Sequence, residues 1–181
     1  MIDRSPDERR TAQPDSSSND LCLDCGLCCD GTIFEWVRLG PEEVAAASAN
    51  GLEPEFKKEG PQFAQPCRQF GGVCRIYAVR PTKCREFRCL LLERVEAGAI
   101  DLADARDIVV EARRLASAAD GAGLATESRS EARARWAGMT DGAGPRGSAA
   151  DAFFMLTMTA LNRYLDRFFR RADQHRIIER D

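Results

Sequence analysis

Eight cysteines, all lying between residues 22 and 89, constrain this chain of 181 residues more than any other feature of its sequence. They fall into two groups of four, Cys22-x2-Cys25-x2-Cys28-Cys29 and, after a gap of 37 residues, Cys67-x6-Cys74-x9-Cys84-x4-Cys89. Two residues between cysteines let a tight turn present both sulfurs to one ion while backbone amides donate to the thiolates. This spacing predicts that all eight cysteines are metal ligands.

The surrounding sequence favours a reducing compartment, in which thiols persist. Residues 1–20 carry charges throughout and contain no apolar segment of the kind found in a secretory signal peptide. No apolar stretch is long enough to span a membrane, so we expect a cytoplasmic protein with no membrane association. Structural disulfides are rare in the cytoplasm, and scattered buried cysteines would not place four within eight residues. Both alternatives to metal binding are therefore disfavoured.

The sequence constrains the number of metal sites and the identity of the metal less than it constrains the ligands. Adjacent Cys28 and Cys29 project differently, so either the doublet is divided between two sites or one member has another role. Eight thiols suit two four-sulfur sites that share ligands across the two groups. Zinc accepts any four thiolates in a tetrahedron, whereas iron–sulfur clusters often use a Cys-x2-Cys-x2-Cys run with a remote fourth ligand. The first three cysteines fit that run, but Thr32 stands where a bacterial ferredoxin has its next cysteine. Zinc and iron both remain open.

Charge argues against a protein that coats nucleic acid, because 26 basic residues face 29 acidic ones and the net charge is −3. The second cysteine group is different, since the segment from Cys67 to Cys89 has a net charge of +5. Its charged residues are Arg68, Arg75, Arg80, Lys83, Arg85, Arg88 and Glu86. We favour the interpretation that these cations offset the negative charge of thiolate metal sites. An anion or nucleic-acid site is the alternative.

Composition divides the chain into three parts: a disordered leader over residues 1–20, a cysteine module over 21–98 and a helical region over 99–181. In the module we predict a strand over 32–39 and helices over 41–50 and 83–97. In the helical region we predict helices over 101–120 and 128–136, with a third opening at Ser148. The expected fold class is α-rich, a small α+β protein with an irregular metal-stapled module and one or two short strands, followed by helices packed as a lid or small bundle.

The last predicted helix is strongly amphipathic. Its apolar stripe contains Phe154, Met158, Leu161, Leu165, Phe168 and Ala172, widened by Phe153, Leu156, Ala160 and Tyr164. The opposite face carries Arg163, Arg167, Arg170 and Arg171, which we expect to be solvated, although a protein partner could bind through these helices.

Two further features point to no chemistry. Residues 142–147 satisfy G-x-G-x-x-G, but no strand precedes them, so we predict a connection between helices rather than a dinucleotide site. The single histidine, His175, is expected to face solvent. With no histidine near the cysteines, the sequence offers no base for cysteine-histidine catalysis, and we assign no catalytic residue.

The cysteine pattern resembles a known family. The run from Cys22 to Cys29, followed by Cys74-Arg-Ile-Tyr-x3-Pro81-x2-Cys84-Arg85-x-Phe87-x-Cys89, is similar to the CxxCxxCC family of zinc- or iron-chelating domains, which includes YkgJ-like cysteine-cluster proteins. The resemblance covers residues 21–92 and implies metal chelation through the eight cysteines. The family also includes flagellin lysine N-methylases, which are longer, and no residue outside the module can be matched to them.

Two hypotheses from different classes follow. The first is a metal-binding protein that chelates zinc or iron, including iron as an iron–sulfur cluster, through all eight cysteines; an exchangeable store or sensor is a variant of it. The second is a protein lysine N-methylase-like enzyme or accessory protein that uses the cysteine cluster as scaffold or redox element. An enzyme should show a deep cavity with converging polar groups beside the cluster, whereas a structural site should be closed.

Overall fold

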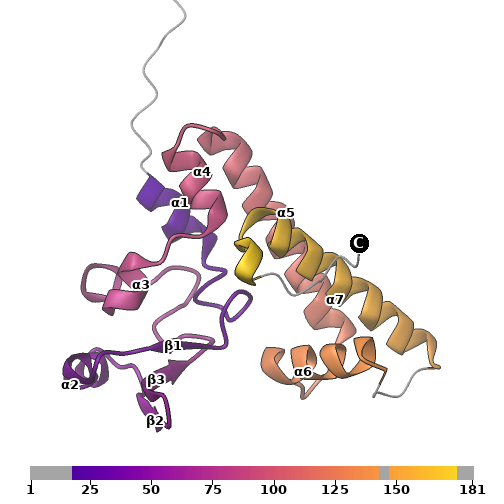
Figure 1. The fold of residues 1–181 in the computed structure, drawn as a ribbon, viewed down its shortest axis with the longest axis horizontal. Coiled ribbons are helices and arrows are strands. Elements are labelled where there is room, and N and C mark those ends of the chain that lie inside the picture. Colours follow the sequence, from indigo (N-terminus) through magenta and orange to yellow (C-terminus); the bar gives the residue numbers. More distant parts are fainter. Residues whose placement is uncertain (1–17, 143–146, 175–181) are drawn as a thin grey trace, which may run out of the picture.

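A computed structural model describes residues 18–142 and 147–174, and its helices and strands form two lobes (Figure 1). The predicted leader otherwise lies outside these residues, but its last three residues already belong to the first helix. The helices are α1 (Ser18–Cys25), α2 (Val44–Ala49), α3 (Thr82–Glu86), α4 (Leu90–Glu96), α5 (Leu102–Ala122), α6 (Arg129–Thr140) and α7 (Ala149–Phe168). The 3-10 turns are η1 (Pro41–Glu43), η2 (Tyr77–Val79) and η3 (Ala172–Gln174), and the strands are β1 (Trp36–Arg38), β2 (Glu55–Lys57) and β3 (Gly60–Ala64).

The three helices predicted in the helical region are confirmed. Each begins after a residue whose side-chain oxygen accepts a backbone N–H of the first turn: Asp101 for α5, Ser128 for α6 and Ser148 for α7. The last two are capping boxes completed by Glu131 and Asp151. Such caps satisfy N–H groups that a helix start leaves unpaired, so local sequence fixes where these helices begin.

One large core holds what we call the helical lobe, which consists of α1, α4, α5, α6 and α7. Small residues of α5, such as Ala112 and Ala116, let α7 approach closely, and Phe154 and Leu165 of α7 fill the space between the helices. Leu27 and Leu91, from the cysteine module, are also buried in this core. The α-rich fold class is confirmed, but packing does not follow the compositional boundary at residue 98, because α1 and α4 pack with the helices beyond it.

A second, smaller core lies under what we call the sheet lobe, which consists of the three strands with α2, α3 and their connections. The strands form an antiparallel sheet in the order β1-β3-β2, with Val37 opposite Phe63. The buried residues are Leu39, Ala47, Leu52, Phe63 and Cys67. Figure 1 shows this sheet and α2 on the far side of the molecule from α6 and α7.

Sequence patterns predicted the strands incompletely. The strand expected over residues 32–39 is confirmed only at 36–38, and the hairpin of β2 and β3 was not predicted. Its turn residues Lys58 and Glu59 are charged and exposed, and Phe56 of β2 is 75% exposed. β2 has three residues, all of them exposed, so it is too short and has no buried face from which alternation could identify a strand.

The helix predicted over residues 83–97 is wrong as a single element, because the chain breaks it into α3 and α4. Phe87 has an extended backbone conformation and packs edge-on against Phe34, with ring centroids 4.6 Å apart. Cys89 then acts as the N-cap of α4, with its sulfur accepting the N–H of Leu92 at 3.4 Å. Cys89 therefore lies at the start of α4, in the break after α3, and not inside one continuous helix.

The amphipathic pattern of α7 also needs correction at its edges. Phe153 and Leu156 do not widen the buried stripe, since they are 57% and 69% exposed. Arg170 is not on a solvated face but buried, where it donates to Asp166 at 2.8 Å and to Asn162 at 3.0 Å. The helix ends at Phe168, so the chain turns Arg170 inward towards side chains of its own last turns.

No helix in the described ranges is long and apolar enough to cross a lipid bilayer.

Candidate metal centre

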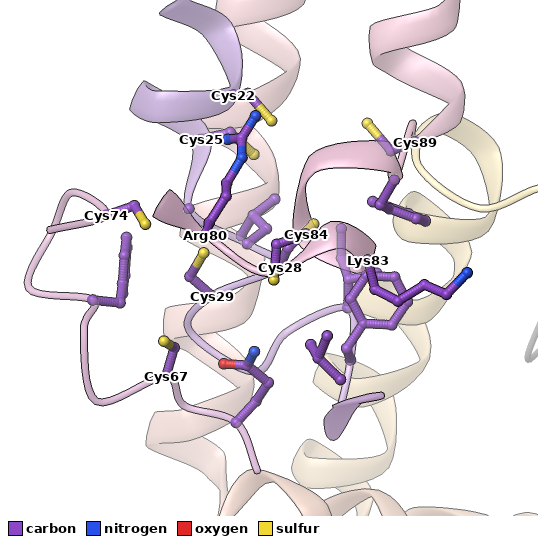
Figure 2. A pocket seen from close by; sticks show the side chains of 18 of the residues that line it. Cys22, Cys25, Cys28, Cys29, Cys67, Cys74, Arg80, Lys83, Cys84 and Cys89 are labelled. Carbon is purple, nitrogen blue, oxygen red and sulfur yellow. The ribbon is translucent and has the colours of Figure 1, made fainter. Parts of the chain in front are cut away.

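All eight predicted ligands line a single cavity of about 730 Å³ between the two lobes (Figure 2). They come from α1, from the loop that follows it, from the segments before and after η2, and from the α3–α4 break. None of them forms a disulfide. The tertiary structure thus brings together cysteines that lie up to 67 residues apart in the sequence, from Cys22 to Cys89.

Four of these thiols belong to the helical lobe, and we call them the helical-side group: Cys22, Cys25, Cys28 and Cys89. Burial raises the pKa of the Cys28 thiol well above its usual value, and the charges of the other three members raise it further. Burial likewise raises the pKa of Cys25 to about 12, with Cys89 and Cys22 as the neighbouring thiols that add to the shift. Cys25, Cys28 and Cys89 also pack against the large core.

The remaining four thiols form the sheet-side group: Cys29, Cys67, Cys74 and Cys84. Burial raises the pKa of Cys29 to about 12, and the charges of Cys74, Cys67 and Cys84 add to this shift. Burial raises the pKa of Cys84 to about 12 as well, with Cys67 and Cys74 as the main thiol neighbours. Cys67 belongs to the small core, and Cys29 and Cys84 pack against it. The larger thiol–thiol interactions and the packing of six of the eight cysteines therefore divide the thiols in the same way. Weaker interactions cross the division, between Cys28 and Cys29, Cys29 and Cys22, and Cys22 and Cys74.

The Cys28-Cys29 doublet is divided between the two groups, as two sites would require. The division follows from the end of α1, where Gly26 has a φ of +66° and a side chain there would meet the ring of Phe70 at 2.3 Å. The N–H groups of Cys29 and Asp30 then donate to the Gly26 carbonyl, at 2.8 Å and 2.9 Å, and close a tight turn. This turn directs neighbouring cysteines to opposite lobes.

Backbone N–H groups point at the sulfurs, as the short spacings predict. Burial is the largest effect on Cys25 and Cys67 and raises the pKa of both thiols. Each thiol also accepts a backbone N–H, from Leu27 and from Gln69 respectively, and this hydrogen bond lowers its pKa. The bond from Leu92 to Cys89 belongs to the same type. Such bonds stabilise a thiolate more than a thiol, so the backbone is arranged for the charged form.

The cations of the +5 segment differ in what they contact. Arg68 pairs with Glu53 at 2.8 Å and Arg88 with Glu96 at 3.3 Å, both near the surface. Arg80 lies between the two groups (Figure 2), and its guanidinium stacks on the ring of Tyr77 at 3.7 Å.

Arg80 is also the cation that interacts with both cysteine groups. Burial raises the pKa values of Cys22 and Cys84, and the charge of Arg80 opposes both shifts. Its Nε atom is buried and finds no hydrogen-bond acceptor among the described residues. Charge compensation therefore rests on single residues, above all Arg80, rather than on the whole segment.

The donor set, eight free thiols, fits a thiophilic metal such as zinc or iron. Within residues 18–142 and 147–174, no three Cys, His, Asp or Glu side chains converge on one ion position. A tetrahedral zinc ion would hold all four sulfurs at about 2.3 Å. Single zinc ions and polynuclear iron–sulfur clusters, which Cys ligands bind from outside, are both compatible with this donor set.

Residues beyond the cysteine module also contact this site, and sequence patterns did not identify them. Arg113, Arg129 and Arg133 donate to backbone carbonyls of the segment that carries the first cysteine group. The sequence signal for them was weak: all but three of the 26 basic residues are arginine, and this bias does not indicate which arginines contact the site.

His175 and residues 143–146 of the glycine-rich motif lie outside the described residues, so no structure bears on the predictions made for them.

The fold and the site define a small α-rich protein built around a cysteine cluster. Residues 21–105 match the model of the CxxCxxCC family, described as "Putative zinc- or iron-chelating domain", so slightly less than half of the chain is similar to that family. The match includes all eight cysteines and extends 13 residues beyond the segment that carries the sequence resemblance, into α5. No curated protein and no solved structure shows a significant match to the chain.

Proposed function

We propose that this protein chelates metal at two adjacent four-thiolate sites, one formed by the helical-side group and the other by the sheet-side group, and that each holds an iron–sulfur cluster. The observation that carries the proposal is the division of eight free thiols into two sets of four around one cavity. The family description supports chelation of zinc or iron, and the choice of iron rests on the size of the cavity and on the Cys-x2-Cys-x2-Cys run.

Two features favour clusters over single zinc ions. A cavity of about 730 Å³ that is lined by all eight cysteines offers far more room than two bare ions need. Cys22, Cys25 and Cys28 form a Cys-x2-Cys-x2-Cys run, and the helical-side group completes it with Cys89 as a remote fourth ligand.

The residues of the chain would prepare the cavity for a negatively charged metal site. Burial raises the pKa values of Cys28 and Cys29, so loading must release protons from these thiols, and affinity must rise as the pH rises. Arg80 and the sulfur-directed N–H groups would then offset the charge of the bound thiolates. A bound cluster would supply electron transfer and a cross-link between the chain segments that carry its four cysteines.

The methylase-like alternative receives less support. The cavity is deep, as an enzyme would require, but its lining is dominated by apolar and thiol side chains. No contact of the described residues identifies a methyl donor site or an acceptor lysine site, so we propose no catalytic step.

The test is the metal and sulfide content of protein purified without oxygen, together with its visible absorption spectrum. We expect brown protein with iron and acid-labile sulfide in amounts that correspond to two clusters. Colourless protein with about two zinc ions would overturn the cluster assignment and leave two thiolate sites standing. Protein that binds neither metal would overturn the proposal, and the cysteines would then be redox thiols.

A further inference from the structure

Three arginines of the helical lobe donate hydrogen bonds to backbone carbonyls of the segment that carries the first cysteine group. Arg113, in the middle of α5, donates from Nε to the carbonyl of Cys25 at 3.0 Å and from Nη2 to the same carbonyl at 2.8 Å. Its Nη2 also contacts the carbonyl of Asp24. These carbonyls end α1, where a helix leaves its last C=O groups unpaired and carries negative partial charge. One side chain thus fixes the end of the helix that presents Cys22 and Cys25.

Two arginines of α6 hold the next turn of the same segment. Arg129 donates to the carbonyl of Asp30 at 2.7 Å and to the hydroxyl of Thr32 at 2.8 Å. Arg133, which is buried, donates to the carbonyl of Thr32 at 2.8 Å and contacts that of Gly31. Cys28 and Cys29 lie between the Arg113 contacts and the α6 contacts, so both ends of the metal-binding turn are anchored.

These contacts join parts of the chain that are far apart in sequence. The three arginines lie 88 to 102 residues beyond the groups to which they donate, and all three follow residue 105, where the family match ends. A guanidinium presents several N–H donors in a rigid plane, so it can fix two carbonyls with less loss of side-chain freedom than a lysine ammonium, whose three donors rotate. A ligand turn held in this way loses less conformational freedom when it binds metal.

We propose that Arg113, Arg129 and Arg133 are positioning residues of the metal centre, and that the helical region beyond the family domain is therefore a functional part of it. This inference rests on the proposed function, since it concerns the affinity of the helical-side site for its metal. Outer residues that orient metal ligands commonly contribute a factor of 10 to 100 in affinity.

Arg113 allows the sharpest test, because it is exposed and its removal leaves neither a cavity nor a buried charge. Arg114 is a matched control: it is adjacent and exposed, and among the described residues its ion pair lies within its own helix, with Glu111 at 2.7 Å. We would measure metal loss from loaded wild type, Arg113→Gln and Arg114→Gln in a chelator competition. Arg113→Gln should lose affinity about 10-fold or more, and Arg114→Gln should remain within about twofold of wild type.

A third variant and a second measurement separate positioning from charge and from folding. Arg113→Lys keeps the charge but not the planar fork, so its affinity should lie nearer to that of Arg113→Gln than to wild type. Thermal melts of the metal-free proteins should be the same for the two glutamine variants. If the wild type binds metal and Arg113→Gln binds it with equal affinity, this inference is overturned while the proposed function stands. Full wild-type affinity in Arg113→Lys would have the same meaning. Wild type that holds no metal would overturn the proposed function and this inference with it.

Discussion

The helical lobe and the sheet lobe each supply four thiols to the cavity, but they differ in how much apolar surface they bury. The core of the helical lobe contains 17 buried residues, whereas that of the sheet lobe contains five, one of which is Cys67. Hydrophobic burial is the main term that offsets the loss of chain entropy, and a small core rarely suffices. The comparison predicts that the helical lobe folds without metal and that the sheet lobe needs the metal proposed for its four thiols.

Removing one ligand from each group should have the largest effect and should separate the lobes. Cys84→Ser should lose half of the bound metal and expose the sheet lobe to protease, because ligation there provides much of the folding free energy. Cys25→Ser should lose the other half while α5–α7 stay protected. Metal per chain and the sites of limited proteolysis measure both effects. Full metal in either variant, or loss of all metal in both, would contradict the division into two groups.

A cavity in the large core should destabilise the helical lobe alone. Phe154 is 1% exposed and lies under the guanidinium of Arg135. Phe154→Ala should lower the free energy of unfolding of this lobe by about 3–5 kcal/mol, measured by denaturant titration of the metal-free protein. Phe153→Ala, the exposed neighbour, is the control and should change little. Equal losses in the two variants would mean that the face of α7 is assigned wrongly.

Glu43 tests how much the sheet lobe gains from polar contacts. Its carboxylate accepts from the N–H and hydroxyl of Thr82, both at 2.7 Å, and from the N–H of Gly40 at 2.9 Å. These bonds tie η1 to the start of α3. Glu43→Gln should destabilise this lobe by about 1–2 kcal/mol, since hydrogen bonds to a charged group are the stronger kind. Glu42→Gln, at an exposed neighbouring position, should be nearly neutral.

The same residue should give the sheet lobe a pH dependence of known sign. Bonds from Gly40 and Thr82 hold the pKa of Glu43 below its usual value. The folded state therefore binds this proton less well than the unfolded chain, and the stabilisation is complete above the unfolded pKa of about 4.3. The difference in stability between wild type and Glu43→Gln should stay constant above about pH 5 and shrink as the pH falls through the folded pKa. A difference that grows towards acid pH would show that the carboxylate is not stabilised as described.

The smallest expected effect is at a helix cap. Ser148→Ala removes the acceptor for the N–H of Asp151, a bond of 3.0 Å, and should cost about 1 kcal/mol in the helical lobe. Ser117→Ala, at an exposed position inside α5, should be neutral or slightly stabilising. Thermal melts of the two variants compare them directly, and a larger loss from Ser117→Ala would contradict the cap.

Local sequence determined much of this protein. Caps such as Asp101, Ser128 and Ser148 mark helix starts because they satisfy N–H groups of the first turn, which depends on neighbours in the chain alone. The clustered cysteines indicated the site and its class, since ligand type and short spacing are local properties.

The tertiary structure decided how these parts combine. No spacing rule pairs Cys89 with Cys28, or Cys84 with Cys29, because the pairing depends on which core each segment packs against. Nor could sequence patterns find Arg113, whose acceptor lies 88 residues away, or show that Arg170 is buried in an ion pair. Contacts between distant segments form only when the whole chain packs. The sequence by itself therefore identified the thiols, and only the fold divided them into two groups and anchored the turn between them.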